Sequence, residues 1–229
     1  MSLLGEGAVA IWHDIAPEGR DEFYAWHGEE HMPERVAIPG FLRGRRYVAI
    51  RGDLEFFNLY ETEHMGVVTG ADYLARLNNP TPWTLSSVKH FRNVSRSLCG
   101  VAASAGHGQG GLIATWRYDV PDERAESHRK AIVEKIVPAL AKKRLVAGAH
   151  FLVADKEASA VKTTEQKVRT ENNRIPRWIV LLEGWGDAKA FDALCGEALS
   201  DRVLGELGAE GAGYGLYQLQ TTRGKTSAG

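Results

Sequence analysis

The stretch AVAIWHDIAPEGRDE (residues 8–22) returns in altered form as LIATWRYDVPDERAE (residues 112–126). Each copy has a short apolar run, then a proline, then the charged start of a helical pattern. The residues matched at an offset of 104 are Trp12 with Trp116, Pro17 with Pro121, and Arg20 with Arg124. Farther along, residues 59–61 match residues 181–183 at a larger offset. The chain is therefore predicted to contain two copies of one structural unit.

Hydrophobic periodicity predicts the same order of elements in both copies. In the first copy we expect strands at 8–15, 41–51, 55–62 and 94–103, with helices at 20–32, 71–77 and 83–90. In the second copy we expect strands at 112–120, 146–154, 177–185 and 213–220, with helices at 123–143 and 188–207. The order βαββαβ is that of a ferredoxin-like unit, whose sheet has helices on one face only. Two such units would cover each other's bare faces, so we expect an α+β fold with two sheets packed face to face as an intrachain barrel.

The boundaries of the two repeats follow from composition. The first repeat is expected over 1–105 and the second over 106–222, joined by the glycine-rich segment 103–111, with a polar tail at 223–229. The second repeat is longer because of residues 154–174, which are polar and lysine-rich and predict an exposed loop. The helix at 20–32 is expected to stop or kink at Pro33.

Composition limits the classes of partner. The chain has 229 residues and a formal net charge of -1, so nothing favours a nucleic-acid partner. Its longest apolar runs are strand-sized, which argues against a membrane partner. Cys99 and Cys195 lie in no metal or redox motif and are expected to be free buried thiols, which favours a cytoplasmic location.

The segment WHGEEHMPER (residues 26–35) admits three interpretations. His27 and His31 with Glu30 fit the H-x-x-E-H spacing of one group of zinc peptidases, but Gly28 and Pro33 weaken the helix and no third ligand stands out. Alternatively, His31 interacts with the dipole at a helix end and has no chemical role. The third interpretation is a small-molecule pocket, between the sheet and the first helix or inside the barrel.

Polar residues on the predicted strands would line such a pocket. Phe56, Asn58 and Tyr60 share one strand face by alternation, and a buried amide such as Asn58 needs a partner from the adjacent strand or a ligand. Arg46 belongs to an arginine run. The run either lies at a solvated edge or pairs with Glu55 and Glu61 across the hairpin, or it supplies a guanidinium for a carboxylate ligand. The candidate substrate-binding residues are Trp12, Asp14, His27, Asn58, Tyr60 and Arg46.

The second repeat serves as an internal comparison. At the offset of 104, His27 and His31 correspond to Ala131 and Lys135. The unit is therefore predicted to fold without these histidines, which favours a function confined to the first repeat.

The segments FYAWHGEEHMPERVAIPGFLRGRRYVA (23–49) and YLARLNNPTPWT (73–84) resemble the dimeric α+β barrel superfamily in its fused two-repeat form. The resemblance is to its EthD-like and uncharacterised bacterial members. The residues on which the resemblance rests are the aromatic residues at 24 and 26, the pair Glu30-His31, Pro33, and the Pro39-Gly40 turn. The superfamily includes cofactor-free monooxygenases, isomerases, decarboxylases, aldoxime dehydratases and haem enzymes, so the resemblance implies a fold rather than a reaction.

We expect an enzyme without metal or cofactor that performs proton transfer on a small hydrophobic or aromatic metabolite, of isomerase, lyase or monooxygenase type. His31 is the expected acid or base, because an ordinary histidine pKa suits proton transfer near neutral pH, and Tyr24 is the second candidate catalytic residue. The alternatives are a non-catalytic binding or structural barrel and a metal or haem protein. A homodimer is a further expectation from the superfamily.

Overall fold

The computed structural model describes residues 3–168 and 173–225, apart from the side chain of Gln166. Eight antiparallel strands form a closed barrel in the order β1-β3-β2-β8-β5-β7-β6-β4. The barrel closes within one chain, because β2 pairs with β8 and β4 pairs with β6 across the two halves. The predicted α+β barrel of two ferredoxin-like units is confirmed.

Both halves have the order βαββαβ. The first half consists of β1 (Gly7–Ile15), a 3-10 turn (Pro17–Gly19), α1 (Arg20–Trp26), a π turn (His27–His31), α2 (Met32–Ala37), β2 (Phe41–Gly52), β3 (Phe56–Thr62), α3 (Met65–Thr69), α4 (Ala71–Asn78), α5 (Pro82–Ser87), a 3-10 turn (Val88–His90) and β4 (Phe91–Gly106). The second half consists of β5 (Leu112–Asp119), α6 (Asp122–Ala131), a π turn (Ile132–Ile136), α7 (Val137–Leu140), β6 (Val146–Ala154), α8 (Lys156–Ala160), α9 (Thr164–Lys167), β7 (Trp178–Gly184), α10 (Ala188–Ala198), α11 (Asp201–Glu206) and β8 (Glu210–Gly224).

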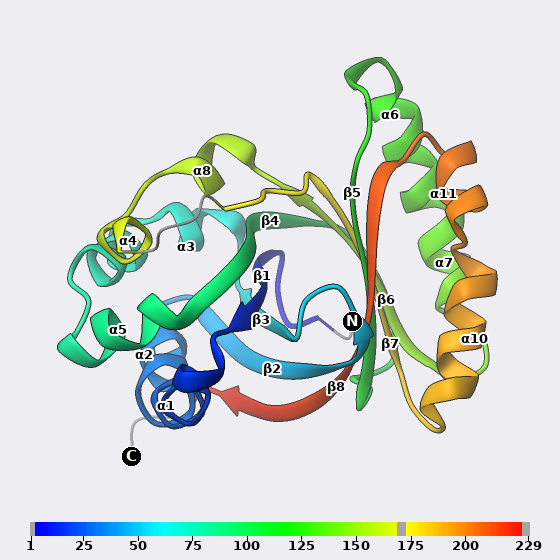
Figure 1. Cartoon of the computed structure of the whole chain (residues 1–229). Coiled ribbons are helices and arrows are strands. Elements are labelled where there is room, and N and C mark those ends of the chain that lie inside the picture. The colour runs from blue at the N-terminus through cyan, green and yellow to red at the C-terminus, as the bar shows by residue number, and fades with distance from the viewer. Residues whose placement is uncertain (1–2, 169–172, 226–229) are drawn as a thin grey trace.

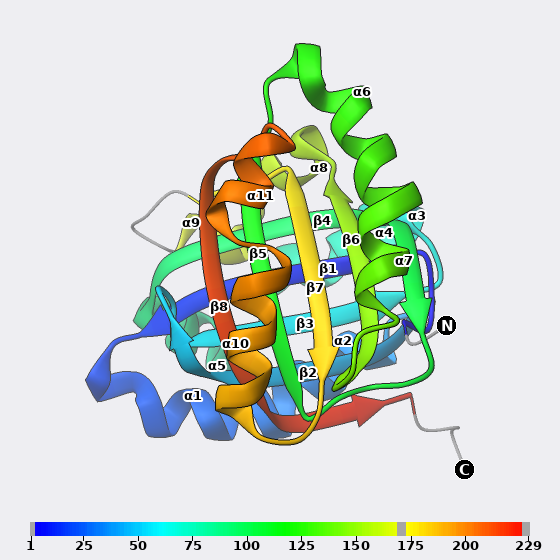
Figure 2. The same ribbon diagram turned by 90° about the vertical axis from the view of Figure 1, so that its right-hand side faces the viewer.

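Helices cover the barrel from two opposite sides. Helices α1 to α5 lie on one side, and α6, α7, α10 and α11 lie on the other (Figure 1). Turned by 90°, the second set lies along the strands of its own half (Figure 2). The molecule therefore has three cores: the barrel interior and one helix-to-sheet interface in each half.

The barrel interior holds a buried charge network besides its apolar side chains. The Arg45 guanidinium contacts Glu61 at 2.9 Å and Glu183 at 3.0 Å, and all three side chains are almost fully buried. Glu183 also lies 3.4 Å from His150 and accepts a hydrogen bond from the Gly110 backbone N–H. Two glutamates from equivalent strands of the two halves thus share one arginine where the sheets face each other.

The structure shifts the alignment of the repeats by one residue. Gly7 and Leu112 begin the first strands, His27 and Ile132 begin the π turns, and Phe41 and Val146 begin the second strands, so the structural offset is 105. A shift of one residue moves a strand side chain to the other face of the sheet. Accordingly Trp12 lies in the barrel interior, whereas Trp116 packs toward the helices of its half.

The helix does not stop at Pro33, which was one of the two predicted outcomes. Helix α2 continues from the π turn through Ala37, and the Met32 N–H donates to the His27 carbonyl five residues back. In an ordinary helix a proline ring clashes with the carbonyl four residues earlier, and the wider π turn relieves that clash. The second half repeats the arrangement, with Pro138 following the π turn Ile132–Ile136.

Three predicted loops are more ordered than expected. Strand β4 runs through Gly106, which shortens the predicted linker at 103–111, and β8 runs through Gly224, into the predicted tail. Residues 154–174, expected as an exposed loop, contain α8 and α9 and bury Ser159, Thr163 and Glu165. The last tail residues, 226–229, and residues 169–172 lie outside the described part of the chain. Among the described residues, no helix is long and apolar enough to cross a bilayer.

Candidate functional site

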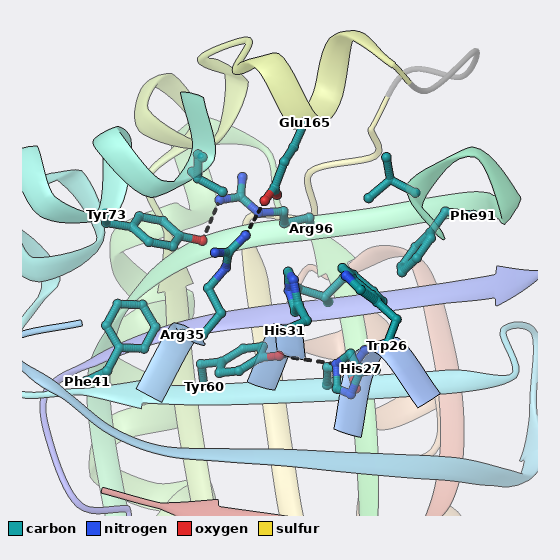
Figure 3. Close-up of a pocket in the computed structure, with 14 residues that line it drawn as sticks. Trp26, His27, His31, Arg35, Phe41, Tyr60, Tyr73, Phe91, Arg96 and Glu165 are labelled. Carbon is teal, nitrogen blue, oxygen red and sulfur yellow. Dashed lines mark hydrogen bonds and ion pairs between the residues drawn. The ribbon is translucent and has the colours of Figure 1, made fainter. Parts of the chain in front are cut away.

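A small cavity lies between the outer face of the first-half sheet and its helices (Figure 3). Its free volume is about 30 Å³. Its lining residues are Ile11, Trp26, His27, His31, Arg35, Phe41, Asn58, Tyr60, Tyr73, Leu77, Val88, Phe91, Arg96 and Glu165. A volume of this size holds one or two water molecules, so a larger ligand requires lining side chains to move.

The π turn and the helix that follows it bring three polar side chains to the cavity. His27 and His31 open and close the π turn, and Arg35 follows four residues later in α2. All three are buried, with 2%, 9% and 3% exposure respectively. This spacing keeps the three side chains on the sheet-facing side of one continuous helix.

His27 is held in one neutral tautomer. Burial, the Arg46 guanidinium and the neighbouring His13 lower the pKa of His27 well below its ordinary value of 6.5. Arg46 Nη1 lies 3.3 Å from His27 Nδ1, and because a guanidinium only donates, Nδ1 must accept. The proton therefore sits on Nε2, which donates to Tyr60 Oη at 3.2 Å. The Tyr60 hydroxyl proton remains available for a further acceptor.

His31 is packed inside the cavity wall rather than exposed at a helix end. Its ring lies 4.2 Å from the Trp26 ring and 5.6 Å from the His27 ring, measured between centroids. The Trp26 indole donates to Thr84 Oγ1 at 3.1 Å, which fixes the aromatic wall against α5. The interpretation of His31 as a helix-end residue is wrong, because the helix continues and the imidazole lines the cavity.

Arg35 forms a buried ion pair with Glu165, which belongs to α9 in the second half (Figure 3). The pair joins residues 130 positions apart, and both side chains are at least nine-tenths buried. Arg35 Nη1 has no hydrogen-bond partner among the residues that the structure describes. A buried guanidinium with an unpartnered donor is suited to bind an oxyanion.

Two strands supply the remaining polar groups. On β4, Arg96 Nη2 donates to Tyr73 Oη at 3.0 Å (Figure 3). On β3, Asn58 Nδ2 lies 2.9 Å from His13 Nε2 on the adjacent strand β1, as the sequence alternative for Asn58 predicted. Asn58 Oδ1 has no partner among the described side chains and backbone groups. The cavity therefore combines hydrogen-bond donors and an acceptor within aromatic walls.

Half of the predicted site residues meet in this cavity. His27, His31, Asn58 and Tyr60 all line it. The others do not, and they are Trp12, Asp14, Tyr24 and Arg46.

Each of these four residues has another environment. Trp12 stacks on Phe57 inside the barrel, at 4.6 Å between ring centroids. Asp14 accepts hydrogen bonds from the Glu55 backbone and the Asn93 amide. Tyr24 packs against Arg46, whose Cζ lies 4.9 Å from the ring centroid. Arg46 thus contacts His27 but does not line the cavity.

The remaining arginines of the run that contains Arg46 are also paired. Arg43 and Arg45 both contact Glu61, as the pairing alternative predicted. Glu55, the other predicted partner, pairs with Arg20 instead.

Four polar lining residues were missed by the sequence interpretation: Arg35, Tyr73, Arg96 and Glu165. Arg35 had a usable signal, because it extends the four-residue spacing of the two histidines. The prediction that the helix ends at Pro33 hid that signal. The other three come from separate elements, and nothing in their local sequence marks them.

The second half carries apolar side chains at the positions that match the site. At the structural offset of 105, His27 corresponds to Ile132, His31 to Ile136 and Arg35 to Leu140. On the third strands, Asn58 corresponds to Val180 and Tyr60 to Leu182, and both counterparts lie in the apolar core. The second half has apolar side chains at these matched positions, although its interface also buries His128 beside Tyr118. The polar cluster at these positions in the first half is therefore not needed to form the fold.

The geometry does not support the zinc-peptidase interpretation. Both ring nitrogens of His27 are engaged, one of them by a cationic guanidinium. Glu30, the residue required as base, accepts hydrogen bonds from Thr81 at 2.6 Å and Thr84 at 3.2 Å. Within the described residues, no group of three or more His, Cys, Asp or Glu side chains is arranged to hold a metal ion.

Comparison with known proteins identifies the fold. No family model matches the chain, and no curated protein matches it. An anthrone oxidase-like protein of known structure has a TM-score of 0.64 at 12% identity, covering 100% of this chain and 99% of that chain. A "putative monooxygenase" from Fusobacterium nucleatum has a TM-score of 0.59 at 9% identity, covering 97% and 96%.

A chlorite dismutase mutant from Candidatus Nitrospira defluvii has a TM-score of 0.54 at 8% identity, covering 94% of this chain and 90% of that chain. Likeness at such low identity establishes the architecture and not the reaction. The chain has the two-unit ferredoxin-like α+β barrel fold that these solved structures share over nearly their whole length.

Proposed function

We propose that this protein is an enzyme that transfers protons on a small hydrophobic or aromatic metabolite, without a metal or cofactor. The observation that supports it is the buried polar cluster of His31, Tyr60 and Arg35, whose matched positions in the second half carry apolar side chains. A polar cluster that the fold does not require, in a site with aromatic walls, is the arrangement expected for a small-molecule site. The relation to EthD-like proteins remains a prediction.

His31 is the proposed acid and base. Its imidazole removes a proton from a carbon next to a carbonyl group, and the electron pair moves onto the carbonyl oxygen. Tyr60 and Arg35 stabilise that oxyanion through the free hydroxyl proton and Nη1. Where a carbon–carbon double bond is conjugated with this anion, return of the proton to the far carbon of that double bond completes an isomerisation. The same anion is the starting point for lyase or oxygenation chemistry.

His27 and Arg46 are positioning residues in this proposal. Arg46 fixes the tautomer of His27, and His27 donates to Tyr60, so the Tyr60 proton is directed away from His27. Tyr24 packs on Arg46 and therefore influences Tyr60 only indirectly, through Arg46 and His27. Tyr60, and not Tyr24, is therefore the proposed second catalytic residue.

The test is exchange of substrate carbon-bound hydrogen with deuterated water, followed by proton NMR for a panel of aryl ketones and aryl keto acids. The wild-type protein should accelerate exchange for at least one compound, and His31→Ala should lower the rate by about 100-fold or more. His64→Ala, at an exposed histidine outside the cavity, is the matched control. An unchanged rate in the His31 variant would remove His31 from the mechanism.

The alternative is a non-catalytic small-molecule-binding protein. The observation that favours it is the small free volume of about 30 Å³, which leaves little room for a reacting group beside the lining side chains. Binding of panel compounds without exchange of any of them would support this alternative.

A further inference from the structure

A second cavity adjoins the candidate site. Its volume is about 160 Å³ and its walls are mostly apolar. Its lining residues are Val68, Thr69, Tyr73, Leu74, Leu77, Arg96, Leu98, Ala158, Val161 and Thr163. Tyr73, Leu77 and Arg96 line both cavities, so the polar site and this apolar cleft are neighbours that share a wall.

The two cavities differ in charge. The polar site contains two buried guanidinium groups, Arg35 and Arg96, and one carboxylate, Glu165. Its formal charge from these groups is positive before the histidines are considered. Among the described residues, none that lines the cleft carries a carboxylate or an ammonium group, and Arg96 marks its boundary with the polar site.

We propose that the joined cavities bind an amphiphilic anion, with its carboxylate at Arg35 and Arg96 and its apolar group in the cleft between α4 and the α8–α9 segment. This inference deepens the proposed function, because it names the class of ligand that the same site takes. Glu165 already forms an ion pair with Arg35, so this guanidinium is able to bind a carboxylate. Arg35 Nη1 supplies a further donor for a second carboxylate.

The size of the cleft sets the size of the apolar group. A dry apolar cavity of about 150 Å³ in another protein takes up benzene. The cleft is of similar volume, so it fits a phenyl ring or a short alkyl chain.

The difference in length between the two repeats supports the assignment. The structural offset is 105 up to the second strands and 122 at the third strands, where Phe56 corresponds to Trp178. The additional residues include α8 and α9, which pack against β4 and α4 of the opposite half. They supply Ala158 and Val161 to the cleft and Glu165 to the polar site. The one large insertion that distinguishes the repeats therefore builds the walls of both cavities.

Direct binding to the full-length protein tests the proposal. Calorimetric titration would compare phenylpropionate, phenylpropionamide and propionate at neutral pH. The amide should bind about tenfold or more weakly than the acid, because it loses a charge-assisted hydrogen bond. Propionate should also bind about tenfold or more weakly than phenylpropionate, because it leaves the cleft unfilled.

Surface variants at Val161 and Ile50 test the cleft without disturbing a core, and a variant at buried Glu165 tests the polar site. Val161 is 51% exposed at the cleft, and Val161→Asp should weaken phenylpropionate binding about tenfold or more and leave propionate unchanged. Ile50→Asp, at a residue 46% exposed on β2, is the matched control and should bind as the wild type does. Glu165→Gln should tighten binding of the acid and not of the amide, because it removes the competing carboxylate.

Each outcome is decisive. Equal binding of acid and amide would overturn the carboxylate assignment, and an unaffected Val161→Asp protein would overturn the cleft assignment. Absence of binding by all three compounds would overturn both. Binding without hydrogen exchange would contradict only the proposed enzymatic function, whereas exchange that depends on His31 in a protein that binds no carboxylate would contradict only the present inference.

Discussion

Protonation of His27 should couple the stability of this protein to pH. His27 is 2% exposed, and its pKa lies well below 6.5 chiefly because of burial, with Arg46 as the next cause. In the unfolded chain the imidazole has its ordinary pKa and takes up a proton as the pH falls below about 6.5. The folded state does not, so the unfolded state binds more protons and stability must fall with falling pH.

The magnitude follows from the size of this difference in proton binding. Each pH unit below the ordinary pKa costs about 1.4 kcal/mol until the folded-state pKa is reached. Between about pH 7.5 and pH 5.5, His27 alone should remove about 1.4 kcal/mol from the free energy of unfolding. Burial lowers the pKa of His128 as well, so that residue adds a loss of the same sign in the same range.

Urea unfolding followed by tryptophan fluorescence at both pH values would measure the effect. His27→Gln retains a polar side chain beside Arg46 and Tyr60 and has no group that titrates in this range. The variant should lose about 1.4 kcal/mol less than the wild type between the two pH values, while the contribution of His128 remains. An equal pH dependence in the two proteins would refute the assignment of a neutral buried imidazole to His27.

Two further predictions concern the fold. Arg45→Met should lower the free energy of unfolding by about 3–5 kcal/mol, because it leaves Glu183 buried inside the barrel without an arginine partner, while Glu61 keeps Arg43. A loss below about 1 kcal/mol in chemical denaturation would contradict the network. Gly40→Ala should cost about 2 kcal/mol or more in the same assay, since Gly40 has φ of +82° and a Cβ there would approach Val67 Cγ2 to 2.5 Å; a stability equal to that of the wild type would contradict this backbone geometry.

The histidine pair shows which features of the site a local sequence pattern can predict. The spacing of His27 and His31 correctly placed both on one helix face, and alternation along β3 correctly separated Asn58 and Tyr60 from Phe57. Both patterns depend only on the period of a helix or a strand. The same kind of reasoning did not find Arg35, because proline was expected to end the helix that the π turn allows to continue.

The sequence by itself determined the duplicated βαββαβ order and the two-sheet architecture, because hydrophobic periodicity and turn residues act over a few neighbouring positions. Only the tertiary structure decided that Trp12 and Trp116 face opposite sides of their sheets, since a one-residue change in alignment is invisible in composition and reverses every strand side chain. It also brought Glu165 to Arg35 from 130 positions away. Contacts of that range depend on how the whole barrel closes, and no local pattern encodes them.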